Sequence, residues 1–234
     1  MWFPEKNWHS RDYIIHNYGC GTIATADLFL YLAMQNQAMQ TPLTASAIYN
    51  EKTVKYENYD LYVRNIDINY THTKHLIAVL GPSLASAINA YSQDYGLGLK
   101  ANWRWKLSYY DMLDIIEEML QSDIPVILSI GPNWPNLMGK KGISFYERKE
   151  IDIQATEGGM EVKSKPYYYQ PVKQGINSHY VAVTGIIKDD IANKIMLRIS
   201  SWGKMYFINY EEYREYIETS STTWMSSLAQ VTKK

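Results

Sequence analysis

The stretch that decides the fold runs from Cys20 to Met34 and reads CGTIATADLFLYLAM. Beyond the cysteine, its only polar side chains are those of Thr22, Thr25 and Asp27. A helix that is apolar nearly all round has to be buried, because no face of it suits contact with water. We therefore expect a central helix here, with the other elements packed around it.

Further helices are expected after this segment, each bounded by capping or turn-forming residues. Ser108 can cap the last of them, Asp111 suits its positive end, and Pro125 follows soon after its close. The first half of the chain should therefore be mainly helical. The expected helices are Thr44 to about Val54, Thr71 to Leu80, Ser83 to Tyr95 and Ser108 to Gln121.

The periodicity changes at Pro125, where a short β-branched apolar run (VILSI, residues 126–130) ends at Gly131 and predicts a buried strand. Turn residues between later apolar runs predict two hairpins, and Asn209 can cap a last helix. The expected strands are residues 143–154, 160–169, 179–187, 194–200 and 205–208, and the last helix is 210 to about 217.

Helices followed by mostly antiparallel strands predict the α+β class. We expect one domain over residues 1–234, with a helical subdomain over about 1–122 and a sheet subdomain over about 123–234. The helix that begins at Cys20 should pack on the sheet.

The composition narrows the classes of partner. Hydrophobic residues make up 46% of the chain against 20% charged, which suits a packed core. The formal net charge of -1 gives no field for steering onto nucleic acid, so we expect no nucleic-acid partner. The longest apolar stretch is far shorter than the roughly 20 residues that cross a bilayer, so no membrane span is expected. The start MWFPEK does not predict a signal peptide, and we expect a cytoplasmic protein.

Cys20 is the only cysteine, which leaves two interpretations, a buried structural residue or a reactive thiol. It stands between Gly19 and Gly21 at the start of the expected helix. Backbone N–H groups and the positive helix end favour an anion there and would lower the pKa of the thiol. We therefore expect a thiolate that is nucleophilic at neutral pH.

A thiolate mechanism needs a base, and His179 has the most suitable context of the five histidines. It begins an apolar strand (HYVAVTGII, residues 179–187), where a rigid sheet can aim its ring. The alternative is a satisfied strand histidine. His72 and His75 share an expected helix at a spacing of three, which suits either a metal or a solvated face.

Three motifs together resemble a known family. YGCGT (residues 18–22) before an apolar helix resembles the nucleophile motif of papain-like cysteine peptidases. PVILSI (residues 125–130) and SHYVAVTG (residues 178–185) resemble two motifs of the bacterial peptidase C39-like branch. SSWG (residues 200–203) resembles the Asn-Ser-Trp-Gly segment of papain-like enzymes. The motifs follow the family's order over most of the chain, and the resemblance implies the papain-like cysteine proteinase fold.

The resemblance also implies roles for site residues. Cys20 would attack a carbonyl and His179 would shuttle the proton. Ser200 stands where the family has the Asn or Asp that orients the histidine, and Ser201 beside it is the alternative. Trp202 matches a tryptophan that shields the histidine, although core packing would equally explain it.

A glutamine that completes the oxyanion hole in the family is replaced by Ile14. Asn17 is the candidate substitute, since its side-chain amide could donate to an oxyanion, or its oxygen could instead cap the helix.

The resemblance implies a cysteine peptidase or amide hydrolase that forms a thioester acyl-enzyme on Cys20, acts on a peptide or protein, and needs no cofactor or metal. An acyltransferase with the same dyad is a close alternative. The changes at Ser200 and Ile14 favour a second class, a papain-like binding module with impaired catalysis. Residues 139–174, just upstream of His179, are a candidate lid.

Overall fold

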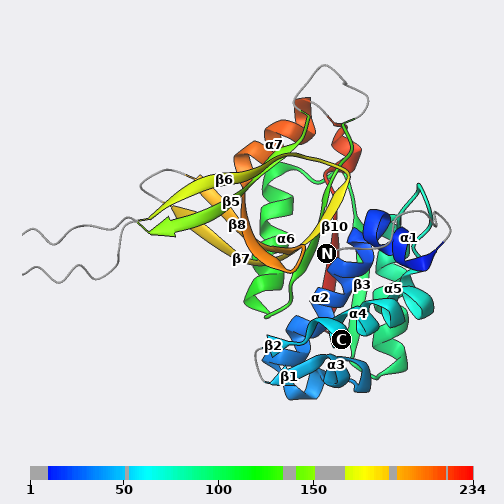
Figure 1. Cartoon of the computed structure of the whole chain (residues 1–234). Coiled ribbons are helices and arrows are strands. Elements are labelled where there is room, and N and C mark those ends of the chain that lie inside the picture. The colour runs from blue at the N-terminus through cyan, green and yellow to red at the C-terminus, as the bar shows by residue number, and fades with distance from the viewer. Residues whose placement is uncertain are drawn as a thin grey trace, which may run out of the picture.

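A computed structural model describes residues 10–50, 53–133, 141–150, 167–189, 194–219 and 221–233. These residues form a mixed α/β structure, in which helices α1 to α5 gather beside a large curved sheet (Figure 1). The α-helices are α1 (Arg11–Tyr18), α2 (Cys20–Gln35), α3 (Pro42–Ala47), α4 (Tyr56–Ile66), α5 (Gly81–Asp94), α6 (Tyr109–Gln121) and α7 (Tyr210–Thr219).

The sheet has eight strands in the described part of the chain, in the order β3-β10-β4-β7-β8-β9-β5-β6, and every neighbouring pair is antiparallel. The short strands β1 (Ile48–Asn50) and β2 (Thr53–Val54) pair separately. The sheet strands are β3 (Leu99–Arg104), β4 (Val126–Ile130), β5 (Ile143–Glu150), β6 (Tyr167–Ile176), β7 (His179–Asp189), β8 (Lys194–Ser201), β9 (Lys204–Asn209) and β10 (Leu228–Lys233).

Helix α2 lies at the centre, as its sequence predicts. It contacts helices α1, α3, α4 and α5 and strands β4, β7 and β8. Leu28 and Phe29 are fully buried in the one hydrophobic cluster that joins these helices to the sheet. The two buried threonines of α2 are satisfied: the Thr22 hydroxyl shares hydrogen bonds with Thr71 and Thr73, both 2.6 Å long, and the Thr25 hydroxyl donates one of 2.9 Å to the Gly21 carbonyl oxygen.

Two expected helices differ from the structure. Only the start of residues 44–54 is helical, in α3, and the chain then turns into β1 and β2. Residues 72–80 form no helix, because His72, Leu76 and Ala78 adopt left-handed backbone angles that a right-handed helix excludes. Helices α1 and α4 were not predicted.

The expected helix over Ser83 to Tyr95 is α5, and the cap of α6 is confirmed. The Ser108 hydroxyl accepts a hydrogen bond of 3.1 Å from the backbone N–H of Asp111. Asn209 likewise caps α7, accepting a bond of 3.1 Å from the backbone N–H of Glu212.

The expected hairpin over 143–154 and 160–169 pairs differently. Strand β5 does pair with a following strand, β6. However, β6 runs from Tyr167 to Ile176, so it shares only residues 167–169 with the expected strand over 160–169. The expected lid over 139–174 is therefore partly two strands, and its residues 139–140 and 151–166 lie outside the described residues. None of the described helices has the length and apolarity needed to cross a membrane.

Candidate active site

Cys20 is the first residue of α2 and is partly exposed. Gly19 ends α1 and begins α2, and only glycine fits there, since a Cβ would lie 2.3 Å from the carbonyl oxygen of Ile15. No side chain caps α2. The first backbone N–H groups of α2 can therefore donate hydrogen bonds to the Cys20 sulfur or to a group bound beside it.

His179 is the first residue of β7 and pairs with Ile130 at the end of β4. Its Nε2 lies 2.8 Å from the Ser201 hydroxyl. The Trp202 ring stacks on the imidazole, with 4.5 Å between ring centroids and 18° between planes. The ring of His179 is thus held at Nε2 by Ser201 and on one face by Trp202.

Burial shifts the pKa of both Cys20 and His179 in the direction that favours the neutral side chain. Burial raises the pKa of the Cys20 thiol, and the backbone amides of Tyr180, Gly21 and Cys20 only partly offset it. Burial also lowers the pKa of His179 from 6.5 to about 4. The expected lowering of the thiol pKa is therefore corrected: desolvation outweighs the backbone N–H groups at the start of the helix, and the pKa is raised.

Ser200 and Ser201 point to opposite faces of the sheet, as neighbouring residues of a strand must. Ser200 pairs with Ala182 and donates a hydrogen bond of 2.7 Å to Oδ2 of Asp27 on α2. Ser201 instead reaches His179. The residue that touches the histidine is thus Ser201, and Ser200, which matches the family's position, serves another partner.

Asp27 is a site residue that the sequence prediction missed. Its Oδ1 accepts a hydrogen bond of 2.7 Å from the Tyr59 hydroxyl of α4, and its Oδ2 accepts from Ser200. Burial raises the pKa of its carboxyl. The signal was available in the sequence, because residues seven apart lie on one side of a helix and Cys20 precedes Asp27 by that spacing.

Trp202 is 47% exposed, so it covers His179 and is not part of the core. It occupies a left-handed turn with Gly203, with φ values of 49° and 69°, which suits a two-residue hairpin between β8 and β9. Lys173 of β6 lies over the Trp202 ring, 4.9 Å from its centroid.

Asn17 lies in α1 and does not cap α2. Its Nδ2 donates a hydrogen bond of 2.9 Å to the Tyr13 carbonyl oxygen, along its own helix. Ile14 lies in the same helix and is partly buried. His16, which the sequence prediction set aside, is exposed and joins Asn17 in lining the pocket described next.

Most of the residues described above line one pocket of about 200 Å³. Cys20, Asp27, His179, Ser200 and Trp202 all line it, together with Ser201 and the Asn17 and His16 side of α1. Helix α2 supplies one wall, and the start of β7 and the end of β8 supply the other. A thiol, an imidazole and a carboxyl in one hollow can support nucleophilic acyl chemistry.

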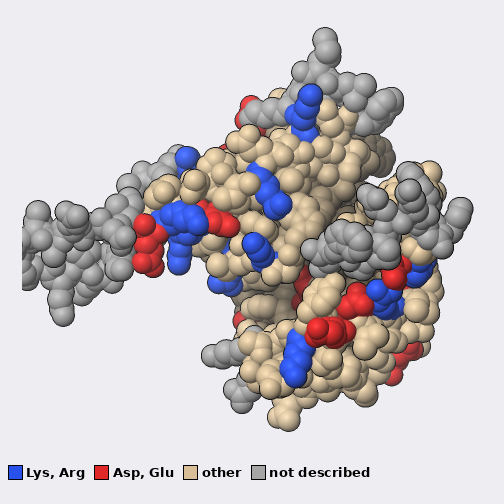
Figure 2. All heavy atoms as spheres, in the orientation of Figure 1, with Lys and Arg blue, Asp and Glu red and all other residues tan. Residues whose placement is uncertain are grey.

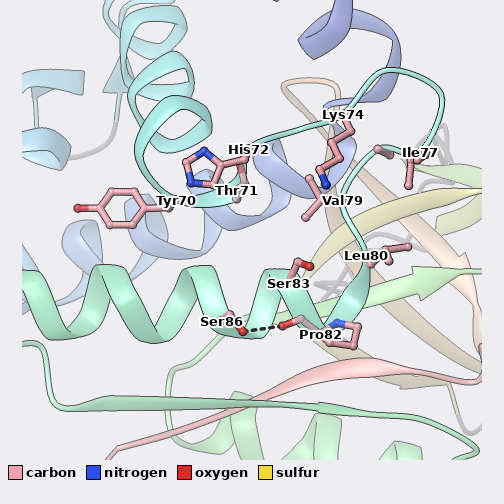
Figure 3. Close-up of a pocket in the computed structure, with 11 residues that line it drawn as sticks. Tyr70, Thr71, His72, Lys74, Ile77, Val79, Leu80, Pro82, Ser83 and Ser86 are labelled. Atoms are coloured by element: carbon pink, nitrogen blue, oxygen red, sulfur yellow. Dashed lines mark hydrogen bonds between the residues drawn. The ribbon is translucent and has the colours of Figure 1, made fainter.

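A larger hollow of about 560 Å³ lies between residues 70–80 and the start of α5 (Figure 3). His72 and Lys74 line it, and the Ser86 hydroxyl donates a bond of 3.0 Å to the Pro82 carbonyl oxygen. His75 packs against Tyr18 instead, with ring centroids 5.2 Å apart. The described residues contain no cluster of three or more side chains that could hold a metal ion.

Positive and negative side chains interleave on the face shown in Figure 2, without a broad field of one sign.

No family model matches the chain, and no curated protein or solved structure is significantly similar to it. The residues of the pocket are therefore the guide to function.

Proposed function

We propose that this chain is a papain-like cysteine peptidase or amide hydrolase that forms a thioester acyl-enzyme on Cys20, with His179 as general base. The observation that carries the proposal is the shared pocket: it holds both side chains, and Ser201 binds Nε2 of His179 so that Nδ1 is available. The order of a buried helix, a strand that begins with histidine and a strand that ends in Ser-Ser-Trp-Gly supports the papain-like assignment.

The proposed reaction begins from the neutral pair. Cys20 Sγ attacks the substrate carbonyl carbon while its proton passes to Nδ1 of His179, and an S–C bond forms as the carbonyl oxygen becomes an oxyanion. Collapse breaks the C–N bond, and the amine leaves with the proton from Nδ1. Water then attacks the thioester, gives a proton to His179, and releases the acid as the S–C bond breaks and the thiol is restored.

Backbone amides at the start of α2 are the proposed oxyanion donors. The amides of Gly21 and Cys20 already lower the pKa of the thiol, so they face the reacting atoms. The Asn17 amide is engaged with Tyr13 and is not assigned this role.

The test is a screen of peptide and acyl-amide substrates with the wild type, Cys20→Ala and His179→Gln. We expect turnover in the wild type, none in Cys20→Ala, and a loss of roughly 100-fold or more in His179→Gln. Mass spectrometry of rapidly quenched wild type should show the acyl group on the Cys20 peptide. Equal turnover by wild type and Cys20→Ala would overturn the proposal, with circular dichroism showing that all three proteins are folded.

The partner that receives the acyl group distinguishes hydrolysis from acyl transfer. Adding an amine acceptor, such as glycinamide, to the same reactions measures the split between acid and amide products. Mainly amide product would assign an acyltransferase using the same two residues.

Two observations favour the second candidate, a binding module. Burial raises the pKa of Cys20, and the Asn17 amide is engaged elsewhere. A module would bind peptides with the same affinity in wild type and Cys20→Ala, without consuming them in either.

A further inference from the structure

Asp27 lines the same pocket as Cys20, further along α2. The two residues are seven positions apart in α2, which places them on one side of the helix and about 10 Å apart along its axis. Ile23 and Ala24 line the pocket between them. A substrate held at Cys20 can therefore extend along this stripe of α2 and reach the carboxyl group.

Both protein partners of the Asp27 carboxyl are neutral hydroxyls. Tyr59 and Ser200 each donate one hydrogen bond of 2.7 Å, one to each oxygen. A carboxylate has about four acceptor sites, so roughly half of its capacity is unused. Within the described ranges, no Lys or Arg forms an ion pair with Asp27.

A carboxylate shielded from water without a cation is costly, and the one fully buried acid among the described residues is paired. Asp67, which is fully buried, forms an ion pair with Arg11. Asp27 faces a pocket instead of an arginine, and no other carboxyl group lines that pocket among the described residues. A ligand that carries a positive charge would supply a counter-ion for the Asp27 carboxylate.

We propose that Asp27 determines specificity by binding an ammonium or guanidinium group of the substrate, about two helical turns from the acyl carbon on Cys20. This inference rests on the proposed function and names the substrate class for the same site. The apolar walls of Ile23 and Ala24 suit the methylene stem of such a group, and the carboxylate receives its charged end.

A purely structural role for Asp27, holding Ser200 and Tyr59 in place, makes a different prediction. A structural carboxyl would affect all substrates alike. A charge receptor affects cationic substrates and leaves the discrimination between neutral ones unchanged.

The first experiment compares kcat/KM for peptide amides that carry lysine, arginine, norleucine or glutamate immediately before the scissile bond, and a second set with the same residues after it. The set that discriminates identifies which side of the bond enters the pocket. We expect the wild type to favour lysine over norleucine by roughly 10- to 100-fold, the range of a charged hydrogen bond. Asp27→Asn should bring that ratio close to one.

Two matched variants serve as controls. Tyr59→Phe removes a donor but keeps the carboxylate, so the lysine-to-norleucine ratio should persist. Asp114→Asn neutralises an exposed carboxylate of α6 outside the pocket and should also preserve it. A wild-type ratio near one in both substrate sets would overturn the inference while leaving the proposed function intact.

The second experiment needs no turnover. Iodoacetamide labelling of Cys20 is followed in the presence of butylammonium or of butanol, its neutral counterpart. We expect butylammonium to protect the wild-type thiol more than butanol does, and this difference to vanish in Asp27→Asn. If no substrate is turned over but the difference is present, the proposed function fails and the cation site stands. Equal protection by the two probes in the wild type overturns the cation site.

Discussion

Neighbouring serines in β8 hold two different parts of the site. Ser201 touches Nε2 of His179, while Ser200 binds Asp27 on the opposite face of the strand. We expect Ser201→Ala to reduce kcat by roughly 100-fold, the usual cost of misplacing a catalytic group. Ser200→Ala should instead lower the free energy of unfolding by about 1 to 3 kcal/mol, because a buried carboxyl oxygen loses its donor.

Steady-state kinetics and urea unfolding of both variants measure the contrast. Ser201→Thr, which keeps the hydroxyl, is the control for the first effect. An equal loss of kcat in Ser200→Ala would contradict the prediction that Ser201, and not Ser200, orients His179.

The neutral state of His179 ties stability to pH. Its pKa is about 4 in the folded protein and 6.5 ordinarily, so between these values the unfolded chain binds a proton that the folded protein does not. Stability from this residue is therefore complete above pH 6.5 and is lost as pH falls toward 4, by up to roughly 3 kcal/mol. Urea unfolding at several pH values measures the slope.

His179→Gln, which cannot titrate, is the control for this slope. Other groups contribute to the acid sensitivity of the wild type, so the quantity of interest is the difference between the two proteins. A difference that stays constant from pH 7 to pH 4 would contradict the assigned pKa of His179.

The sequence alone singles out two of the residues that line the pocket. Cys20 stands out as the only thiol between two glycines, and His179 as the start of an apolar strand. Asp27 was missed although its spacing of seven from Cys20 is visible in the sequence, whereas Tyr59 could not be found, because its contact with Asp27 depends on how α4 packs against α2. The direction of the Cys20 pKa shift was wrongly predicted, since the sequence shows the helix start but not the burial around it.

At the level of elements, the junction between α1 and α2 sets the position of the thiol. Gly19→Ala would place a methyl group 2.3 Å from the Ile15 carbonyl oxygen, so one of the two helices has to shift. We expect a loss of about 1 to 3 kcal/mol in unfolding free energy, the range for overpacking, and altered labelling of Cys20.

Thermal unfolding and the iodoacetamide labelling rate measure these two effects. Asn17→Ala, an exposed change in α1, is the control and should alter stability by less than about 0.5 kcal/mol. Unchanged stability in Gly19→Ala would show that the junction can relax.

Elements with local signals were predicted well. Helix α6 carries its own serine cap, and β4 is a short apolar run between Pro125 and Gly131. Residues 72–80 were wrongly predicted as a helix because nothing in their composition reveals three left-handed residues. Strands β3 and β10 were missed, since they are stabilised by each other across a long separation in sequence.

At the level of the whole molecule, β10 joins two parts of the sheet. Ala229 pairs with Trp103 of β3 and with Ile127 of β4, and it is completely buried. Ala229→Pro removes a backbone donor between two strands and should cost roughly 2 to 4 kcal/mol, the sum of a lost bond and an unsatisfied buried group.

Urea unfolding measures this cost. Val172→Pro in β6 is the control, because β6 is an edge strand of the described sheet that already contains Pro171. Equal losses in the two variants would show that β10 does not join the parts of the sheet as its pairing implies.

The position of β10 also has a consequence for biosynthesis. The ribosome delivers β3 and β4 early, yet the strand that lies between them begins only at Leu228. Until then both strands present open edges to other nascent chains, a situation in which chaperones usually act. A product that stalls before β10 would carry Cys20 and His179 without the strand that joins β3 to β4, so we expect the pocket that they line to be completed only once β10 has been made.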